Sequence, residues 1–315
     1  MRLRYGLLSL AALGMAFPTG SARSQLNGFQ LEPSAVPVDQ ILAGGPPRDG
    51  IPALTDPDVV AASKASWKDD EVVLGVEAGG EARAYPLSIL VWHEIVNDTL
   101  GGKPLLVSYC PLCGTGMVFE RPIHRKGARA QPMTFGVSGL LYRSDLLLYD
   151  RETESLWSQI SSEAVTGPSM GRRLRLLRSR MMSWGDWRRL HPSSEILSRN
   201  TGYDQPYGRS PYGDYAQSKR LSFPVKYDRS YHPKMPTIGL RVPGTAARAY
   251  PAAELVAAGG EVRERFAGHS VRIRFDPDQE VFDVEAPSEV EIVEAYWFAW
   301  MAFHPETTVF KAAER

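Results

Sequence analysis

Ala82-Arg-Ala-Tyr-Pro86 decides the expected fold of this 315-residue chain, because the same five residues return as Ala247-Arg-Ala-Tyr-Pro251. Each copy follows an apolar run and a glycine-containing turn, at 72–80 in the first case and at 237–244 in the second. This pattern predicts a β-hairpin, and the proline that closes it predicts a short helix directly afterwards.

Two further matches follow in the same order along the chain. Gly102-Lys-Pro-Leu-Leu-Val-Ser-Tyr109 matches Gly268-His-Ser-Val-Arg-Ile-Arg-Phe275 at an offset of 166 residues, and Trp184-x-x-Trp187-x-x-x-His191-Pro192 matches Trp297-x-x-Trp300-x-x-x-His304-Pro305 at an offset of 113. The spacing places both tryptophans of each match on one helix face, and the proline ends the helix. Because both copies carry the histidine, we interpret it as structural.

The three matches predict an α+β, β-rich fold of two related β-rich modules, each with short helices, from a decayed internal duplication. The change of offset predicts about 53 additional residues in the first module, with apolar and aromatic runs that are typical of extra strands. The expected segments are a signal peptide at 1–22, an N-terminal lead-in at 23–66, a first module with the insertion at 67–199, a linker rich in tyrosine, glycine and proline at 200–236, and a second module at 237–315.

Residues 1–22 have the features of a secretory signal. Arg2 and Arg4 precede an apolar run at 7–17, and Gly20-Ser-Ala22 offers small residues for cleavage. The apolar run is too short for a stable membrane anchor. We therefore expect a periplasmic or extracellular protein with no membrane span after signal removal.

Charge and motifs exclude several classes of partner. The 36 basic and 36 acidic side chains balance, which gives no overall electrostatic signal for nucleic acid. The chain also lacks a phosphate-binding loop and a dinucleotide fingerprint, so no nucleotide cofactor is expected. The expected partner is an unidentified small molecule or protein.

Cys110 and Cys113 are the two cysteines of the chain, and they follow the apolar run 104–109 in a Cys-x-x-Cys turn. The offset of 166 residues places this turn on Asp276-Pro-Asp-Gln279, an ordinary hairpin turn without a thiol. The hairpin therefore does not need cysteines in order to fold. We interpret the pair as a functional addition to the first module.

Three functions are compatible with such a pair. A disulfide would close a very short loop and contribute only about 2 kcal/mol, so an inert bridge in a non-catalytic binding module is one reading. A thiol–disulfide or metal-dependent redox enzyme is a second reading. A redox cysteine usually lies at a helix N-terminus, where the dipole lowers its pKa, whereas residues 114–119 look like a turn and a strand. Whether the protein is an enzyme stays open.

The third reading is a metal site. A strand, Cys-Pro-x-Cys-Gly and a second strand have the shape of a zinc knuckle. His93 is the expected third ligand, because the first module alone carries it, and a Cys110, Cys113 and His93 set suits copper or zinc. The alternative for His93 is a buried histidine bonded to backbone. Four residues of the insertion could complete the pocket, with turn-capping as the alternative for the two aspartates: Ser138, Tyr142, Asp145 and Asp150.

Four motifs resemble those of the domain of unknown function 3179 family (DUF3179). They are Trp92-His-Glu-Ile-Val-Asn-Asp98, Tyr109-Cys-Pro-Leu-Cys-Gly-Thr115, Phe135-Gly-Val-Ser-Gly-Leu-Leu-Tyr142 and Tyr149-Asp-Arg-Glu-Thr-Glu-Ser-Leu-Trp-Ser-Gln159. The similarity extends from about Gly44 to the C-terminus. It implies an exported or lipid-anchored bacterial or archaeal protein, and it implies no particular reaction.

Overall fold

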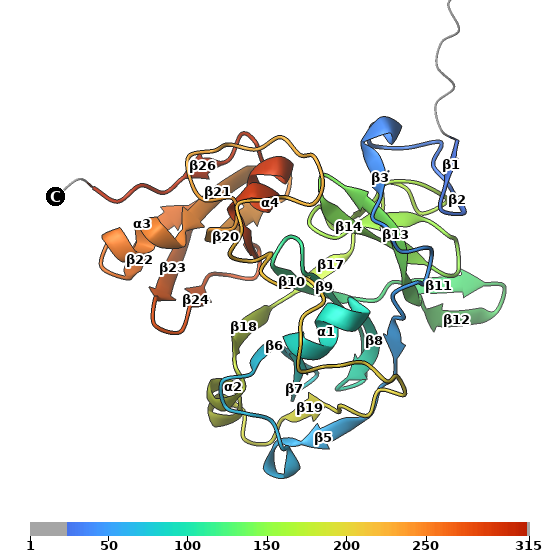
Figure 1. Cartoon of the computed structure of the whole chain (residues 1–315), viewed down its shortest axis with the longest axis horizontal. Coiled ribbons are helices and arrows are strands. Elements are labelled where there is room, and N and C mark those ends of the chain that lie inside the picture. Colours follow the sequence, from blue (N-terminus) through green and yellow to red (C-terminus); the bar gives the residue numbers. More distant parts are fainter. Residues whose placement is uncertain (1–23, 314–315) are drawn as a thin grey trace, which may run out of the picture.

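The computed structural model describes residues 24–313, so the expected signal peptide lies outside the described residues. The described chain is rich in β-strands, as the sequence predicts. Five sheets of three to five strands are arranged in the manner of the blades of a β-propeller (Figure 1). Four short α-helices accompany them: α1 (Leu87–His93), α2 (Trp184–Leu190), α3 (Ala252–Ala257) and α4 (Trp297–Phe303).

The first Ala-Arg-Ala-Tyr-Pro copy forms the second strand of a hairpin in the sheet β18-β6-β7-β19-β5. Gly79 and Gly80 make the turn with φ of +59° and +83°, a conformation that glycine adopts without a Cβ clash. Pro86 then precedes α1 directly, as expected. The strands are β5 (Val59–Ala61), β6 (Val72–Ala78), β7 (Glu81–Pro86), β18 (Ser179–Ser183) and β19 (Glu195–Leu197).

The second copy lies in a sheet with the same pairing, β25-β20-β21-β26. In both sheets the hairpin is antiparallel, its first strand pairs antiparallel with the strand before the tryptophan helix, and its second strand pairs parallel with the strand after that helix. The strands are β20 (Pro236–Val242), β21 (Ala246–Pro251), β25 (Glu291–Tyr296) and β26 (Thr308–Val309).

One tryptophan of each helix packs on a glycine of the hairpin. A Cβ built on Gly75 would lie 2.3 Å from the Trp187 ring, and a Cβ built on Gly239 would lie 2.1 Å from the Trp300 ring. Each of these tryptophans also packs on the histidine at the end of its helix, with 4.1 Å between ring centroids in both cases. The shared Trp and His positions therefore hold a helix against a sheet, as the structural interpretation of the histidines requires.

After the helix that follows Pro86, and again after the helix that follows Pro251, the chain forms a further hairpin. Cys110 pairs with Thr115 in the first half, and Asp276 pairs with Val281 in the second, so the two turns have the same register. The first sheet contains β4 (Leu54–Thr55), β8 (Ile95–Leu100), β9 (Lys103–Cys110), β10 (Thr115–Glu120) and β17 (Arg175–Leu177), and the second contains β22 (Glu261–Phe266), β23 (His269–Asp276) and β24 (Val281–Glu285).

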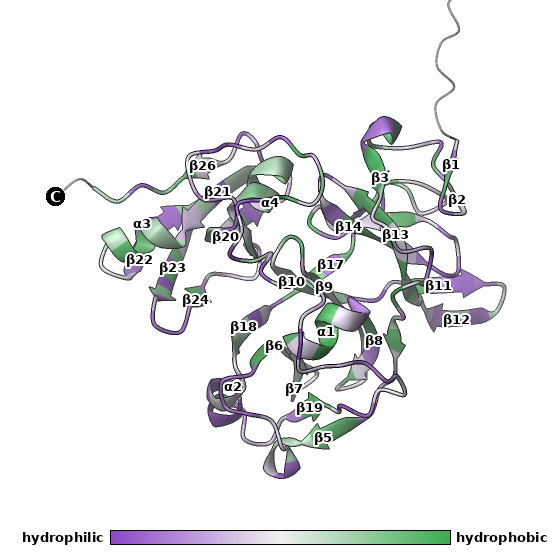
Figure 2. Ribbon diagram, in the orientation of Figure 1, coloured by the Kyte–Doolittle hydropathy of each residue, from purple (hydrophilic) through white to green (hydrophobic). Residues whose placement is uncertain are grey.

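The strands that the sequence predicts at 135–142, 145–150 and 155–159 are present. The sheet β16-β15-β14-β13-β3 is built on two strands that are buried throughout, β13 (Phe135–Tyr142) and β14 (Asp145–Asp150). Its other strands are β3 (Ile41–Ala43), β15 (Leu156–Ser158) and β16 (Glu163–Ala164). By contrast, the hairpin of β11 (Ile123–Lys126) and β12 (Arg129–Pro132) projects outward and is largely hydrophilic (Figure 2). A small pair, β1 (Gln25–Leu26) and β2 (Phe29–Gln30), begins the described chain.

The largest hydrophobic cluster joins the hairpin of β9 and β10, the sheet that contains β13 and β14, and α4 with the sheet that contains β25. It contains Cys110 and Cys113 together with Trp157 of β15 and Trp300 of α4. The expected linker at 200–236 has no regular helix or strand before β20 begins at Pro236, and it packs against this cluster through tyrosines. Among residues 24–313, no helix has the length and apolarity that a bilayer crossing would need.

Candidate functional site

The Cys-x-x-Cys turn joins β9 to β10 and packs against the second half of the molecule. Gly114 has a φ of +59° and a built Cβ there would lie 2.7 Å from the Tyr296 ring, so only glycine fits this position. The Tyr296 backbone N–H donates to the Cys113 carbonyl at 2.8 Å. In the second half, Glu280 has the corresponding positive φ, +53°, and the Asp276 side chain caps that turn.

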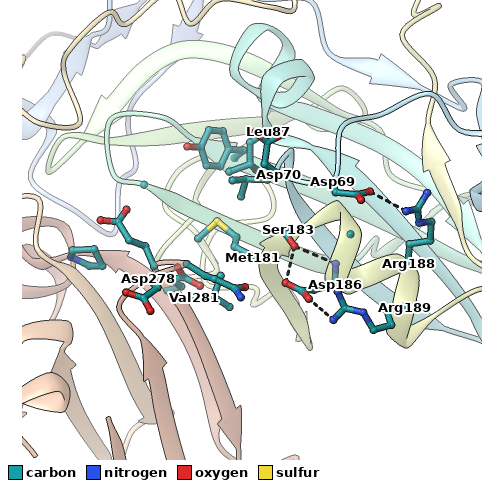
Figure 3. A pocket seen from close by; sticks show the side chains of 18 of the residues that line it. Asp69, Asp70, Leu87, Met181, Ser183, Asp186, Arg188, Arg189, Asp278 and Val281 are labelled. Carbon is teal, nitrogen blue, oxygen red and sulfur yellow. Dashed lines mark hydrogen bonds and ion pairs between the residues drawn. The ribbon is translucent and has the colours of Figure 1, made fainter. Parts of the chain in front are cut away.

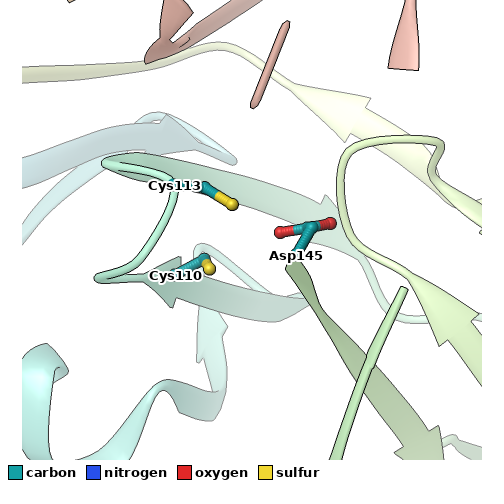
Figure 4. A group of neighbouring side chains, drawn as sticks. All are labelled: Cys110, Cys113 and Asp145. Atoms are coloured by element: carbon teal, nitrogen blue, oxygen red, sulfur yellow. The ribbon is translucent and has the colours of Figure 1, made fainter. Parts of the chain in front are cut away.

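Both cysteines are free thiols, and their side chains face the interior with exposed fractions of 1% at Cys110 and 0% at Cys113. Asp145 approaches them from a different sheet (Figure 4). It begins β14, directly after Arg143 and Ser144, whose positive φ values of +52° and +68° turn the chain sharply. One ligand atom from each of Cys110, Cys113 and Asp145 lies within 4.8 Å of the other two.

The Asp145 carboxylate is incompletely satisfied. Its Oδ2 accepts a hydrogen bond of 3.1 Å from the Ile160 backbone N–H. Its Oδ1 is buried and has no partner of strict hydrogen-bond geometry within residues 24–313, but both thiols lie beside it and act on the carboxylate as hydrogen-bond donors. The Cys113 sulfur instead contacts the Ser144 carbonyl at 3.4 Å. A buried oxygen with such poorly aligned donors is incompletely satisfied, so this atom marks a position where an additional group would stabilise the site.

The electrostatic surroundings of the three side chains are acidic. Burial raises the pKa of Asp145 to about 7, against smaller opposing effects of the Ile160 N–H and the thiols. Burial also raises the pKa of both thiols, and the nearby Asp145 carboxylate raises the thiol pKa further. The thiols are therefore protonated near neutral pH, and a bound cation would reverse these effects.

Glu94 contributes to this acidic environment and was missed by sequence reasoning. It ends α1 in a left-handed conformation, with φ of +57°, and its side chain is 7% exposed. The Tyr212 hydroxyl donates to its Oε1 at 3.2 Å, and burial raises its pKa to about 7. The sequence feature that could have identified Glu94 is its place directly after His93, in one of the four motifs that resemble the family.

His93 lies elsewhere. Its ring is fully buried, with Nδ1 2.7 Å from the Pro52 carbonyl and Nε2 2.7 Å from the Tyr207 hydroxyl. Because a carbonyl can only accept, Nδ1 donates and Nε2 accepts. Over the described range 24–313, His93 is not in the group of ligand side chains that contains the cysteines. The alternative interpretation, a histidine bonded to backbone, describes this geometry.

The other insertion residues have structural contacts. Asp150 accepts from the Thr153 backbone N–H at 2.6 Å and from Trp157 Nε1 at 2.8 Å, so it caps a turn. The Ser138 hydroxyl donates to a backbone carbonyl, and the Tyr142 ring packs edge-on against Phe303. Of the two candidate aspartates, Asp145 is the one that shares a ligand group with the cysteines in the described part of the chain.

An open groove of about 1060 Å³ borders the cysteine turn on its outer side, where Gly114 and Tyr296 line it. It lies between α2 and the turn before β24 (Figure 3). Two of its carboxylates are paired, Asp69 with Arg188 at 2.9 Å and Asp186 with Arg189 at 2.6 Å. The remaining carboxylates that line it are Asp70, Asp278, Glu280 and Glu294. The cysteine side chains do not open into this groove.

The comparisons with known proteins give a family and no function. No curated protein and no solved structure matches the chain. Residues 48–286 match the family described as "Protein of unknown function (DUF3179)". This range includes the cysteine turn, Asp145 and most of the second half. The chain therefore belongs to the DUF3179 family, as its four motifs predict.

Proposed function

We propose that this is an exported protein that binds a thiophilic metal ion, zinc or copper, through Cys110 and Cys113, with Asp145 in the third position that the sequence assigns to His93. The observation that carries the proposal is that two buried sulfurs and a buried carboxylate oxygen lie within 4.8 Å of one another. Residues 1–22 support the export part of the proposal.

The distances between the three ligand atoms are close to those that a bound metal ion requires. Zinc binds thiolate sulfur at about 2.3 Å and carboxylate oxygen at about 2.0–2.2 Å, so neighbouring ligand atoms of a tetrahedral site lie roughly 3.5–3.8 Å apart. The atoms here lie within 4.8 Å of one another before any ion is bound. Side-chain rotations of the three residues are sufficient to close that difference.

The buried position of the thiols favours metal binding over the two alternatives. Reactive redox cysteines are partly exposed and have a lowered pKa, whereas here burial raises the pKa of both thiols. An inert disulfide would add little stability across so short a loop, and the thiol-free turn at Asp276 adopts the same register.

We also propose that the two halves arose by duplication of one module and that the site was added to the first. The identical pairing of the two four-strand sets and the repeated Trp-on-Gly contacts support this origin. The second half keeps the turn but has Asp276 and Gln279 at the cysteine positions.

Metal analysis of the mature chain, purified without a histidine tag under reducing conditions, tests the function. We expect one zinc or copper ion per chain, and loss of that ion in Cys110→Ser and in Cys113→Ser. Asp276→Ser, at the corresponding position of the thiol-free turn, is the matched control and should keep the ion. Absence of metal from the wild-type protein after reconstitution with either ion would refute the proposal. Mass analysis of the secreted chain tests cleavage after Ala22.

A further inference from the structure

Resting on the proposed function, we infer that Asp145 is a zinc-specific ligand: it completes a zinc(II) site with Cys110 and Cys113 and biases that site toward zinc(II) relative to copper(I). The donor set is the first reason. Thiolate sulfur suits both ions, but a carboxylate oxygen is a ligand for zinc and is too hard for copper(I). Two sulfurs among three ligands also exclude magnesium and calcium, which require oxygen ligands.

The buried charge is the second reason. With all three ligands ionised, the site carries three negative charges, and the buried Glu94 near Cys110 is also acidic. Zinc(II) leaves one net negative charge on the three ligands, and copper(I) leaves two. Because burying an uncompensated charge is costly, the divalent ion is the better match when Asp145 is ionised.

The third reason is the position of the second carboxylate oxygen of Asp145, Oδ1, beside the two sulfurs. Asp145 is fully buried, its Oδ2 is already held by the Ile160 N–H, and within the described chain its Oδ1 has only the two thiols beside it, in poor hydrogen-bond geometry. A copper(I) ion held by two thiolates alone would leave this oxygen without a partner. A zinc ion satisfies it directly. On binding, the two thiol protons leave to solvent, together with the Asp145 proton where it is present.

Competition titrations on the mature, reduced chain under anaerobic conditions test the inference, with zinc(II) and copper(I) each measured against a chromophoric chelator. We expect Asp145→Asn to weaken zinc binding by at least tenfold while copper(I) binding changes by less than threefold. Asparagine keeps an oxygen for the Ile160 N–H, and circular dichroism verifies the fold. Asp278→Asn, an exposed position in the thiol-free turn, is the control and should change neither affinity.

If Asp145→Asn weakened the binding of both ions equally, or did not weaken zinc binding, the proposed role of Asp145 would be wrong. The two proposals fail differently: if wild type binds neither ion, the metal function itself is wrong, whereas binding of both ions with an unaffected Asp145→Asn variant refutes only the zinc-specific ligand. X-ray absorption on the zinc-loaded chain is a second measurement. We expect two sulfurs per zinc in wild type and three in Asp145→Cys. A count of two in the folded Asp145→Cys variant would place residue 145 outside the coordination sphere.

Discussion

The Asp145 carboxylate and the Cys113 sulfur lie within 4.8 Å of each other, although Asp145 belongs to one sheet and Cys113 to a turn of another. Asp145 starts β14 in the insertion, and Cys113 lies in the turn before β10. The contact depends on how the sheet that contains β14 packs against the sheet that contains β9 and β10, because the largest hydrophobic cluster includes residues of both. The candidate site is therefore a product of tertiary packing around a locally encoded turn.

The thiols should react slowly in the folded protein. Cys110 and Cys113 are 1% and 0% exposed, and burial raises the pKa of both, so little reactive thiolate is accessible. With a disulfide reagent at pH 8, we expect less than one thiol per metal-free chain to react within minutes, and two to react at once in denaturant. Tyr215→Ala, which removes a buried ring close to both cysteines, should speed the reaction. Rapid reaction of two thiols in the native wild type would contradict the buried site.

His93 should stabilise the fold without binding the ion. His93→Gln removes the paired contacts to the Pro52 carbonyl and the Tyr207 hydroxyl, and we expect a loss of about 1–3 kcal/mol in the free energy of unfolding. Urea denaturation measures the loss, and metal analysis of the same sample should still give one ion per chain. Tyr207→Phe, which removes one of the two contacts, should cost less. Loss of metal from a folded His93→Gln variant would restore His93 as a ligand.

The two Trp-on-Gly contacts should be sensitive to a single methyl group. Gly75→Ala brings a Cβ within 2.3 Å of the Trp187 ring, and Gly239→Ala brings one within 2.1 Å of the Trp300 ring. Overpacking of this kind costs about 1–3 kcal/mol, which urea denaturation would detect in each variant. Gly208→Ala, where a Cβ has no neighbour within 4 Å, is the matched control and should be neutral. Equal stability of all three variants would show that the helices do not pack as described.

The ion pair of Arg83 and Asp98 should show strong coupling. Arg83 Nη1 lies 2.7 Å from Asp98 Oδ2, which also accepts from the Tyr85 hydroxyl at 2.7 Å, and both partners of the pair are buried. Arg83→Met leaves the Asp98 charge unpaired and should cost about 3–5 kcal/mol. Adding Asp98→Asn should recover part of that loss. A double-mutant cycle from denaturant melts checks the coupling, and strictly additive effects would contradict it.

Glu294 should make the protein less stable as pH rises. It lines the groove between α2 and the turn before β24 and is partly exposed, and loss of hydration there raises its pKa to about 8 from an ordinary value of 4.5. Between these two values the folded protein holds a proton that the unfolded chain has released, so the free energy of unfolding falls as pH increases from about 4.5 to about 8. Glu294→Gln should reduce this fall in melts taken between pH 5 and pH 8, whereas the exposed control Glu289→Gln should not. An unchanged pH profile in Glu294→Gln would show that the carboxyl is ionised in the fold.

The sequence by itself determined the local elements of this protein. Hairpins followed by helices at Pro86 and Pro251 and the strand–turn–strand at Cys110 are encoded by consecutive residues, since alternation, turn glycines and prolines act over a few positions. The family membership also followed from the motifs. The tertiary structure alone decided which distant groups meet. It brought Asp145 to the cysteines and held His93 between Pro52 and Tyr207, because such contacts depend on how whole sheets pack, and residue spacing along the chain does not encode that packing.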